Sequence, residues 1–175
     1  MSTLEHDISI DESEALSFAD ISRILSGRVK GCSILYVDLE NVKQKYTLER
    51  LLGQHDCACI LVTAHAAGDQ RHWTVLHKLK GTYYFFDSLA LNWPMLDQLI
   101  GDNRVTTFIK SIKAQKSTRK LQAHIRKIRT CGCHAAIRCA KYKLNYSQYV
   151  KWLTSNRNST ADRTVVKLCY LGLLS

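Results

Sequence analysis

The spacing of hydrophobic residues changes several times along the chain, which predicts a mixture of helices and strands. Over residues 17–25 the apolar positions recur three and four residues apart, the spacing of an amphipathic helix, and Gly27 follows where that helix would end. Apolar runs over 32–39 and 57–63 predict two strands, and residues 47–52 predict a short helix. The apolar positions of the first helix are Leu16, Phe18, Ile21, Ile24 and Leu25.

Two short strands are predicted next, over 73–77 and 82–86, and they lie close enough in sequence to form a hairpin. The connecting residues 78–81 end in a glycine, a residue that short hairpin loops favour. A loop of these residues pairs the last residue of the first strand, His77, with the first residue of the second, Thr82.

This register has a consequence for two polar residues at the far end of the hairpin. Counting back along the ladder, His72 lies opposite Asp87. Directly opposed residues have Cβ atoms about 4.5–5.5 Å apart, which lets a carboxylate hold an imidazole ring in one tautomer. A loop of another length shifts the pairing by one or two residues.

The second half of the chain is mostly helical in pattern. Residues 93–100 and 146–153 each predict a helix, and a third helix is predicted to begin at Cys131. Residues 105–112 fit a helix or a strand, and so do the apolar residues 165–174.

These elements predict an α+β fold, in which a mixed, mostly antiparallel sheet packs on a central helix that begins at Cys131. The chain has no internal repeat and one proline, so we expect a single domain over residues 1–175. Residues 1–14 are polar and acidic, and we expect them to be flexible.

Charge is unevenly distributed. The net charge is +10, from 25 Lys and Arg against 15 Asp and Glu, and no acidic residue occurs from Asn103 to Ala161. This span is either a solvated basic face or, as we favour, a surface for nucleic acid or another polyanion. No aromatic residue interleaves with its dense part, which indicates phosphate contacts rather than base stacking. The predicted contacts are Lys110, Lys113, Lys116, Arg119, Lys120, Arg126, Lys127 and Arg129.

The chain has seven cysteines and no pattern of a secreted or membrane protein. No apolar run approaches the length of a membrane span, and the N-terminal residues are acidic rather than basic and apolar. We therefore expect free thiols in a reducing compartment and no membrane partner. An odd number of cysteines leaves room for one with a chemical role.

Two groups of cysteine and histidine raise the alternative of a zinc site. Structural zinc usually takes Cys-x₂₋₄-Cys pairs, whereas both groups offer Cys-x-Cys within segments that read as buried elements. We therefore expect no metal and keep zinc as the alternative. The groups are Cys131, Cys133, His134 and Cys139, and His55, Cys57, Cys59 and His65.

Cys131 is the strongest candidate for a reactive thiol. It precedes Gly132 at the predicted start of a helix, where the dipole and the free N–H groups stabilise a thiolate and can hold an oxyanion. A nucleophilic cysteine also needs a base and a group that orients the base. His72 and Asp87, at the end of the hairpin, are the candidates for these roles.

Three segments resemble the adenovirus-type cysteine proteases, and more closely the versions found in large DNA transposons and related DNA viruses. The resemblance covers roughly residues 60–153, and this group shares its site architecture with the SUMO-specific proteases. It implies that Cys131 is the nucleophile, His72 the general base and Asp87 its orienting partner, with Trp73 beside the site. The segments are Arg71-His72-Trp73, Tyr84-Phe85-Phe86-Asp87-Ser88-Leu89 and Thr130-Cys131-Gly132.

The glutamine that holds the oxyanion in this family departs from its usual position. The family places it six or seven residues before the nucleophile, where this chain has Ile125 and His124. Gln122, nine residues before, fits the family's Leu-Gln pattern if the loop has gained two residues. Gln115 and His124 are the alternatives for this role.

The resemblance also implies a function. It suggests a cysteine endopeptidase that cleaves precursors of virus structural proteins after small residues, in the host nucleus or cytoplasm and in the virion. We expect a monomer that needs no cofactor for the chemistry, with DNA or an activating peptide as a candidate stimulant. The alternatives are a protease that removes ubiquitin-like modifiers, and a basic nucleic-acid-binding structural protein whose thiol is inert.

Overall fold

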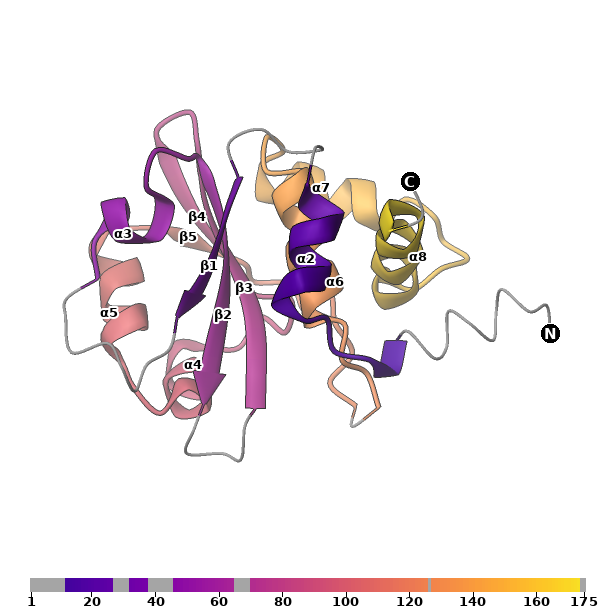
Figure 1. The fold of residues 1–175 in the computed structure, drawn as a ribbon, viewed down its shortest axis with the longest axis horizontal. Helices are drawn as coiled ribbons and strands as arrows, with labels where there is room; N and C mark the ends of the chain where they lie inside the picture. Colours follow the sequence, from indigo (N-terminus) through magenta and orange to yellow (C-terminus); the bar gives the residue numbers. More distant parts are fainter. Residues whose placement is uncertain (1–11, 27–31, 38–45, 65–69, 126, 174–175) are drawn as a thin grey trace.

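The computed structural model describes residues 12–26, 32–37, 46–64, 70–125 and 127–173. A mixed sheet lies between two layers of helices, which confirms the predicted α+β class (Figure 1). The helices are α2 (Phe18–Leu25), α3 (Leu48–Leu52), α4 (Trp93–Ile100), α5 (Arg104–Ser111), α6 (Cys131–Ala140), α7 (Tyr146–Leu153) and α8 (Ala161–Leu173).

The strands follow one another across the sheet in the order β1-β2-β3-β4-β5. The two inner pairs, β2–β3 and β3–β4, are antiparallel, whereas the outer pairs β1–β2 and β4–β5 are parallel. Because β5 has two residues, the sheet is mostly antiparallel, as predicted. The strands are β1 (Cys32–Val37), β2 (Cys57–Ala64), β3 (Gln70–Leu79), β4 (Thr82–Phe86) and β5 (Gln115–Lys116).

The predicted hairpin loop is wrong in length. Leu79 pairs with Thr82, so the turn consists of Lys80 and Gly81 alone, and the pairing is shifted by two residues from the predicted one. Both turn residues have positive φ, 49° and 81°, as in the tight turns whose twist matches that of paired strands. Asp87 continues this register opposite Thr74 and is therefore a diagonal neighbour of His72 on the same face.

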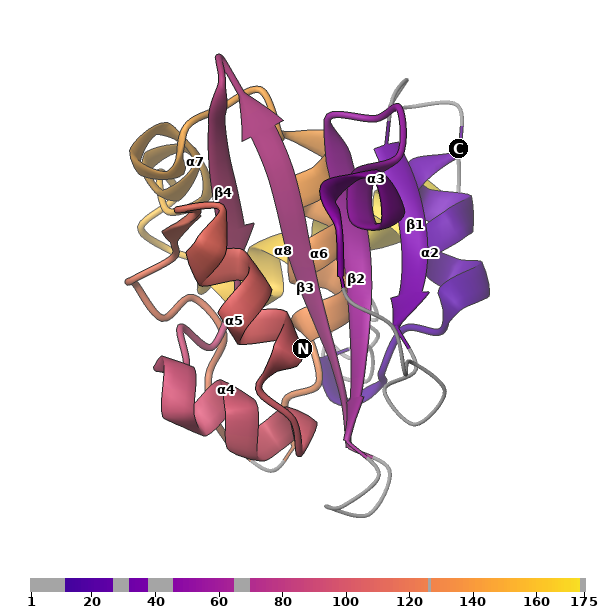
Figure 2. The same cartoon turned by 90° about the vertical axis from the view of Figure 1, so that its left-hand side faces the viewer.

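Side chains alternate between the two faces of the sheet, and each face has its own core. In β2, Ala58 and Ile60 join the core beneath α3, α4 and α5, while Cys57 and Cys59 join the core around α6. Figure 2 shows α3, α4 and α5 in front of the sheet and α6 behind it. The α6 core also includes buried residues of α2, α7 and α8: Ile21, Ile24, Tyr149, Leu153, Val165 and Cys169.

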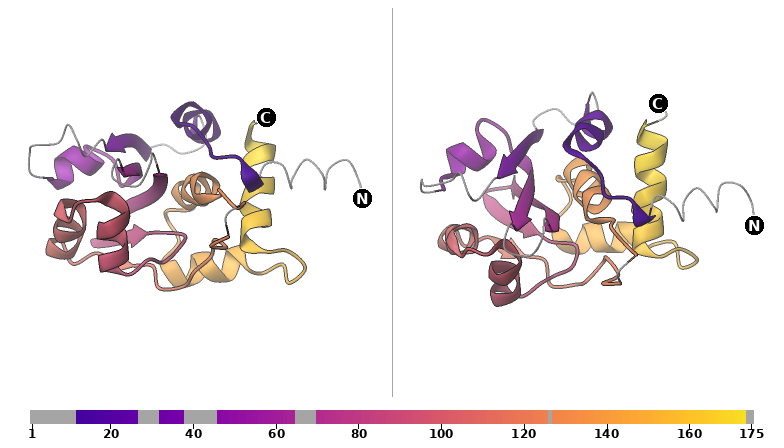
Figure 3. Two further views of the ribbon diagram at one scale, coloured as in Figure 1. Left: turned by 90° about the horizontal axis from the view of Figure 1, so that it is seen from below. Right: turned by 60° about the horizontal axis from the view of Figure 1, so that its bottom comes forward.

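Helix α6 is central in the molecule and begins at Cys131, as predicted. Every residue from Cys131 to Cys139 is buried, because the sheet covers one side and α2 and α8 cover the others (Figures 1 and 3). Ala135 and Ala136, both 0% exposed, keep the helix slim enough for this close packing.

The two segments that fitted either a helix or a strand are both helical. In α5, Val105 and Ile109 point into the core, and the Thr106 hydroxyl donates to the Asp97 carboxylate of α4. In α8, Val165 and Cys169 repeat four residues apart on the side that faces α6. None of the helices in the described ranges is long and apolar enough to cross a bilayer.

Some predicted features lie outside the described residues: most of the predicted flexible segment 1–14, the end of the predicted strand at 38–39, His65 and Arg126. Within that segment, residues 12–14 are described, and the carbonyl of Glu12 accepts a hydrogen bond from the Arg129 N–H at 2.8 Å.

Candidate active site

His72 and Asp87 form a buried ion pair at the end of the β3–β4 hairpin. The His72 Nε2 and Asp87 Oδ1 atoms are 2.8 Å apart, and the two side chains are 4% and 0% exposed. Because a carboxylate only accepts hydrogen bonds, Nε2 is the donor. The other ring nitrogen, Nδ1, is thus the one left for a second partner.

Asp87 is held through both its carboxylate and its backbone. Its Oδ1 and Oδ2 atoms accept from the N–H groups of Leu89, at 2.9 Å, and Leu91, at 2.8 Å. The Ser117 hydroxyl accepts from the Asp87 N–H and donates to the Asp87 carbonyl, at 2.9 and 2.8 Å. Burial alone would raise the pKa of Asp87, but the hydrogen bonds from His72, Leu89 and Leu91 outweigh it and lower the pKa, so this carboxylate is charged.

The Cys131 thiol is the second partner of His72. The groups beside it that lower its pKa are the His72 side chain and the backbone N–H groups of Trp73 and Gly132. Burial alone would raise the pKa of the thiol, but the hydrogen bond and positive charge of His72, with the two N–H groups, outweigh it. The pKa of Cys131 is therefore lowered from its ordinary value of 9.0.

His72 responds in the opposite direction. Burial alone would lower its pKa, but the hydrogen bonds to Asp87 and Cys131 and their negative charges raise the pKa to about 10. The lowered pKa of the thiol and the raised pKa of the imidazole are the two shifts that favour a thiolate–imidazolium pair of Cys131 and His72. The three residues selected from the sequence thus meet at one point, while their catalytic roles remain predictions.

β3 extends beyond the end of β4, which lets the start of α6 lie against the hairpin. β4 ends at Phe86, opposite Val75, so the earlier part of β3 has no partner strand on that side among the described residues. The Trp73 N–H lies in this part of β3 and is one of the groups that lower the pKa of Cys131. The Trp73 side chain, 3% exposed, packs beside the site, and its Cδ1 atom lies 3.2 Å from where a Cβ atom on Gly132 would be.

Gln122 lies on the loop between β5 and α6 and is 5% exposed. Its Oε1 atom accepts from the Ser88 hydroxyl at 2.8 Å, and its backbone N–H donates to the Ser88 carbonyl at 3.0 Å. Ser88, which directly follows Asp87 in the chain, thus holds this loop in place. Because Ser88 engages the amide oxygen, the NH₂ group is what Gln122 can offer to an anionic oxygen.

The other two candidates for the oxyanion role have different surroundings. Gln115 belongs to β5, where it pairs with Tyr84, and its side chain is exposed. His124 is exposed as well, two residues beyond Gln122. The burial of Gln122 and its bond to Ser88 favour it over both.

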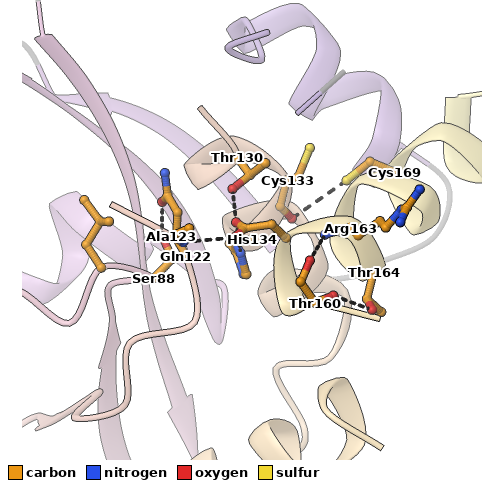
Figure 4. A network of polar contacts seen from close by, with 12 residues as sticks. Ser88, Gln122, Ala123, Thr130, Cys133, His134, Thr160, Arg163, Thr164 and Cys169 are labelled. Atoms are coloured by element: carbon orange, nitrogen blue, oxygen red, sulfur yellow. Dashed lines mark hydrogen bonds and ion pairs between the residues drawn. The ribbon is translucent and has the colours of Figure 1, made fainter. Parts of the chain in front are cut away.

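A second polar network, centred on Asp162 of α8, was not predicted from the sequence. Its Oδ1 atom accepts from the Thr130 hydroxyl and from His134 Nε2, the latter at 3.1 Å, and its Oδ2 atom accepts from the Ala123 N–H at 2.8 Å. Figure 4 shows Ala123, Thr130 and His134 gathered at the beginning of α8. The sequence carried one signal: Asp162 is the first acidic residue after the acid-free span.

Asp162 is charged in this network. Burial alone would raise the pKa of Asp162, but the hydrogen bonds from His134, Thr130 and Ala123 outweigh it and lower the pKa.

The predicted polyanion contacts fall into two groups. Near α4, Lys110 and Lys116 lie over the Trp93 ring, 5.3 and 5.4 Å from its centroid, so an aromatic residue distant in sequence does join them. Lys116 is half-buried, and burial lowers its pKa. Lys113 is exposed. The other described members lie on the loop that carries Gln122 and are exposed: Arg119, Lys120, Lys127 and Arg129.

The first group of the zinc alternative lies entirely on α6, and the second includes Cys57 and Cys59 of β2. The residues in the described ranges include no group of three or more His, Cys, Asp or Glu arranged to hold a metal ion.

Comparisons with known proteins add no family assignment. No protein-family model matches the chain, and a search of curated proteins gives no match. The resemblance to the adenovirus-type proteases therefore depends on the motif residues alone.

Proposed function

We propose that this protein is a cysteine endopeptidase with Cys131 as its nucleophile, His72 as its general acid and base, and Asp87 as the residue that orients His72. The observation that carries the proposal is the position of the His72 ring, which is hydrogen-bonded to Asp87 through Nε2 and lies close enough to the Cys131 thiol for each to shift the pKa of the other. This is the arrangement that thiol acyl transfer requires: a nucleophile in contact with a base, and a base held by a third group.

In the acylation step, the Cys131 thiolate attacks the peptide carbonyl carbon and forms a C–S bond, and the carbonyl oxygen becomes an oxyanion. The Gln122 NH₂ group and backbone N–H groups at the start of α6 are the donors proposed for this oxyanion. The C–N bond then breaks as the His72 imidazolium gives its proton to the leaving amine, which leaves a thioester on Cys131 and a neutral imidazole.

In the hydrolysis of the thioester, His72 first acts as a base rather than as an acid. Neutral His72 takes a proton from water while the water oxygen attacks the thioester carbonyl. The C–S bond breaks, the product carboxylic acid leaves, and Cys131 and His72 return to the thiolate–imidazolium pair. Asp87 keeps the ring in one orientation throughout and stabilises its positive charge whenever the ring is protonated.

The basic loop supports a polyanion as a stimulant of this activity. Lys127 and Arg129 are exposed and precede Cys131 by four and two residues, so bound phosphate groups would lie next to the site. Processing of virus structural precursors, and cleavage after small residues, remain what the motif resemblance implies.

A thiol-directed peptide vinyl sulfone tests the proposal. We expect one adduct per chain, mapped by mass spectrometry to the peptide that contains Cys131, and no adduct in Cys131→Ala. Cys133→Ala is the matched control, because Cys133 lies two residues along the same helix and is buried. Labelling at another cysteine, or cleavage of a precursor by Cys131→Ala, would show that the assignment is wrong.

Related labelling and binding experiments distinguish the two alternative functions. A probe made from a ubiquitin-like modifier that labels Cys131 much faster than peptide probes do indicates a deconjugating protease. Salt-dependent DNA binding without any labelling of Cys131 indicates a nucleic-acid-binding protein with an inert thiol.

A further inference from the structure

Asp162 lies outside the three residues of the proposed site, yet it contacts both segments that would surround a developing oxyanion. One segment is the loop that carries Gln122, and the other is the start of α6. The two are joined in the chain only through residues 124–129, whose described members are mostly exposed. Asp162 belongs to a third element, the first turn of α8, and is itself 5% exposed.

The contact with the loop is a single hydrogen bond at an informative position. The Asp162 Oδ2 atom accepts from the Ala123 N–H at 2.8 Å. Ala123 directly follows Gln122, whose side chain is fixed on its other side by Ser88. Gln122 thus lies between two anchors, one on the hairpin and one on α8.

The contact with α6 affects the groups that cap the helix. Thr130 occupies the N-cap position, where a threonine hydroxyl ordinarily accepts from an N–H of the first turn. Here it makes no such bond, and it donates to Asp162 instead. The first-turn N–H groups therefore keep their capacity to donate to an oxyanion.

We propose that Asp162 is a positioning residue for the oxyanion site: its carboxylate fixes the Gln122 loop through Ala123 and holds the Thr130 hydroxyl away from the N–H groups at the start of α6. His134 Nε2, 3.1 Å from Oδ1, completes the set of donors that keep the carboxylate in place. This inference rests on the proposed function, because it assigns Asp162 a role in the same reaction.

The proposal separates two properties of the site. The pairing of Cys131 with His72 depends mainly on the charges of His72 and Asp87, whereas the Asp162 carboxylate bonds to Ala123, Thr130 and His134. Stabilisation of the oxyanion depends on the position of the loop. A reagent that needs only the thiolate and a ligand that also needs the oxyanion site should therefore respond differently to loss of Asp162.

The test compares wild type with Asp162→Ala by three measurements: alkylation of Cys131 by iodoacetamide, the dissociation constant of a peptide aldehyde, and kcat and KM for a matching peptide. The aldehyde forms a tetrahedral adduct whose oxygen occupies the oxyanion position, whereas alkylation forms no oxyanion. We expect the aldehyde affinity and kcat to fall by roughly 10- to 100-fold, the scale for a small misplacement of catalytic groups, with alkylation and KM within about threefold of wild type.

Three further variants control for simple loss of stability. Asp162→Asn keeps an acceptor for the Ala123 N–H and should restore most of the aldehyde affinity. Cys169→Ala alters buried packing of α8 without touching the loop, and should leave aldehyde affinity unchanged. If Asp162→Ala does not fold, Ala123→Pro removes the N–H that donates to Asp162, also restricts the backbone of Gln122, and should give the same selective loss.

Unchanged aldehyde affinity in a folded Asp162→Ala or Ala123→Pro variant overturns the inference. An equal fall in alkylation and aldehyde affinity also overturns it, because Asp162 would then support the whole site or the fold. Failure of the proposed function is distinct: wild-type Cys131 would then react with neither the aldehyde nor the vinyl sulfone.

Discussion

The Cβ atom of Leu16 lies 2.8 Å from the position that a Cβ atom on Gly132 would occupy. Leu16 also accepts a hydrogen bond through its carbonyl from the Trp73 indole N–H at 3.1 Å. The segment before α2 thus packs directly on the residues that follow His72 and Cys131. Only a residue without a side chain leaves room for this contact, since real Cβ atoms do not approach so closely.

Gly132→Ala should therefore force the segment around Leu16 away from Trp73. We expect the free energy of unfolding to fall by about 1–3 kcal/mol, as for other overpacked sites, and kcat/KM to fall with it. Thermal or urea unfolding followed by Trp fluorescence measures the first effect, and peptide hydrolysis measures the second.

Leu16→Gly provides the compensating change, because it removes the Cβ atom that the new methyl group meets. The double variant Leu16→Gly with Gly132→Ala should lose less stability than the sum of the two single variants. Strict additivity would contradict a direct clash between these two positions.

Gln122 should be the side-chain donor to the oxyanion. Removing one such donor typically lowers kcat by about 10²–10³-fold, and we expect this for Gln122→Ala with a much smaller change in KM. Gln115→Ala and His124→Ala are matched controls, since both side chains are exposed, and should leave kcat within about twofold of wild type, as surface positions away from the oxyanion. A large fall in either control, with Gln122→Ala active, would assign the role to that residue instead.

The pH dependence of Cys131 alkylation should reveal the ion pair. Because the thiol pKa lies below 9.0, the thiolate is present at lower pH than for an ordinary cysteine, and the rate declines only as the pH falls through the lowered pKa. His72→Ala removes the main group that lowers the thiol pKa. Burial then raises the pKa of Cys131, and the rate of alkylation at pH 7 should fall by about tenfold or more. His124→Ala is the control.

The alkaline side of the pH–rate profile for peptide hydrolysis depends on His72. Its pKa of about 10 means that the imidazolium is present below that pH and lost above it. The rate of peptide hydrolysis should thus form a plateau that ends near pH 10, where the proton donor for the leaving amine disappears. A decline centred near the ordinary pKa of a histidine, about 6.5, would contradict the ion pair.

The hairpin illustrates how much of the site could be predicted from the sequence. Two short runs of strand-favouring residues identify both strands, but a turn over residues 78–81 would place His72 directly opposite Asp87. The actual two-residue turn puts Asp87 opposite Thr74, and the diagonal relationship still brings the His72 and Asp87 side chains to 2.8 Å. The sequence thus predicts the pairing of these residues for a geometric reason that is partly wrong.

The supporting residues could not be predicted, because their roles come from tertiary contacts. Ser117 contacts Asp87 across 30 positions, and Asp162 contacts Thr130 across 32. Hydrophobic periodicity carries no information about such pairs. The absence of acidic residues before Asp162 draws attention to the basic residues rather than to the carboxylate that ends the span.

Ser117→Ala should destabilise the protein and reduce activity together. The Asp87 N–H and carbonyl are both buried and would lose their shared partner, at a cost of about 1–3 kcal/mol in the free energy of unfolding. We also expect a several-fold lower kcat, because Asp87 holds His72. Ser117→Cys, or another substitution that keeps a hydrogen-bonding group, should recover part of both losses, measured by urea unfolding and peptide hydrolysis.

The basic residues of the Gln122 loop should dominate DNA binding. Replacing Lys120, Lys127 and Arg129 by Gln should weaken binding of a double-stranded oligonucleotide. The slope of log K against log salt should decrease by about 0.9 for each phosphate group that the variant no longer neutralises. Because all three side chains are exposed, we expect no large effect on the free energy of unfolding. Fluorescence anisotropy over a range of salt concentrations gives both quantities.

A charge-matched control distinguishes this loop from a general effect of net charge. Lys78, Lys141 and Lys143 are exposed near the hairpin turn and the end of α6, away from Cys131, and their replacement by Gln removes the same charge. If the loop is the binding surface, this control should retain most of the affinity and the salt slope. Equal losses in the two triple variants would show that DNA responds to overall charge, and would remove the reason to place a polyanion beside the site.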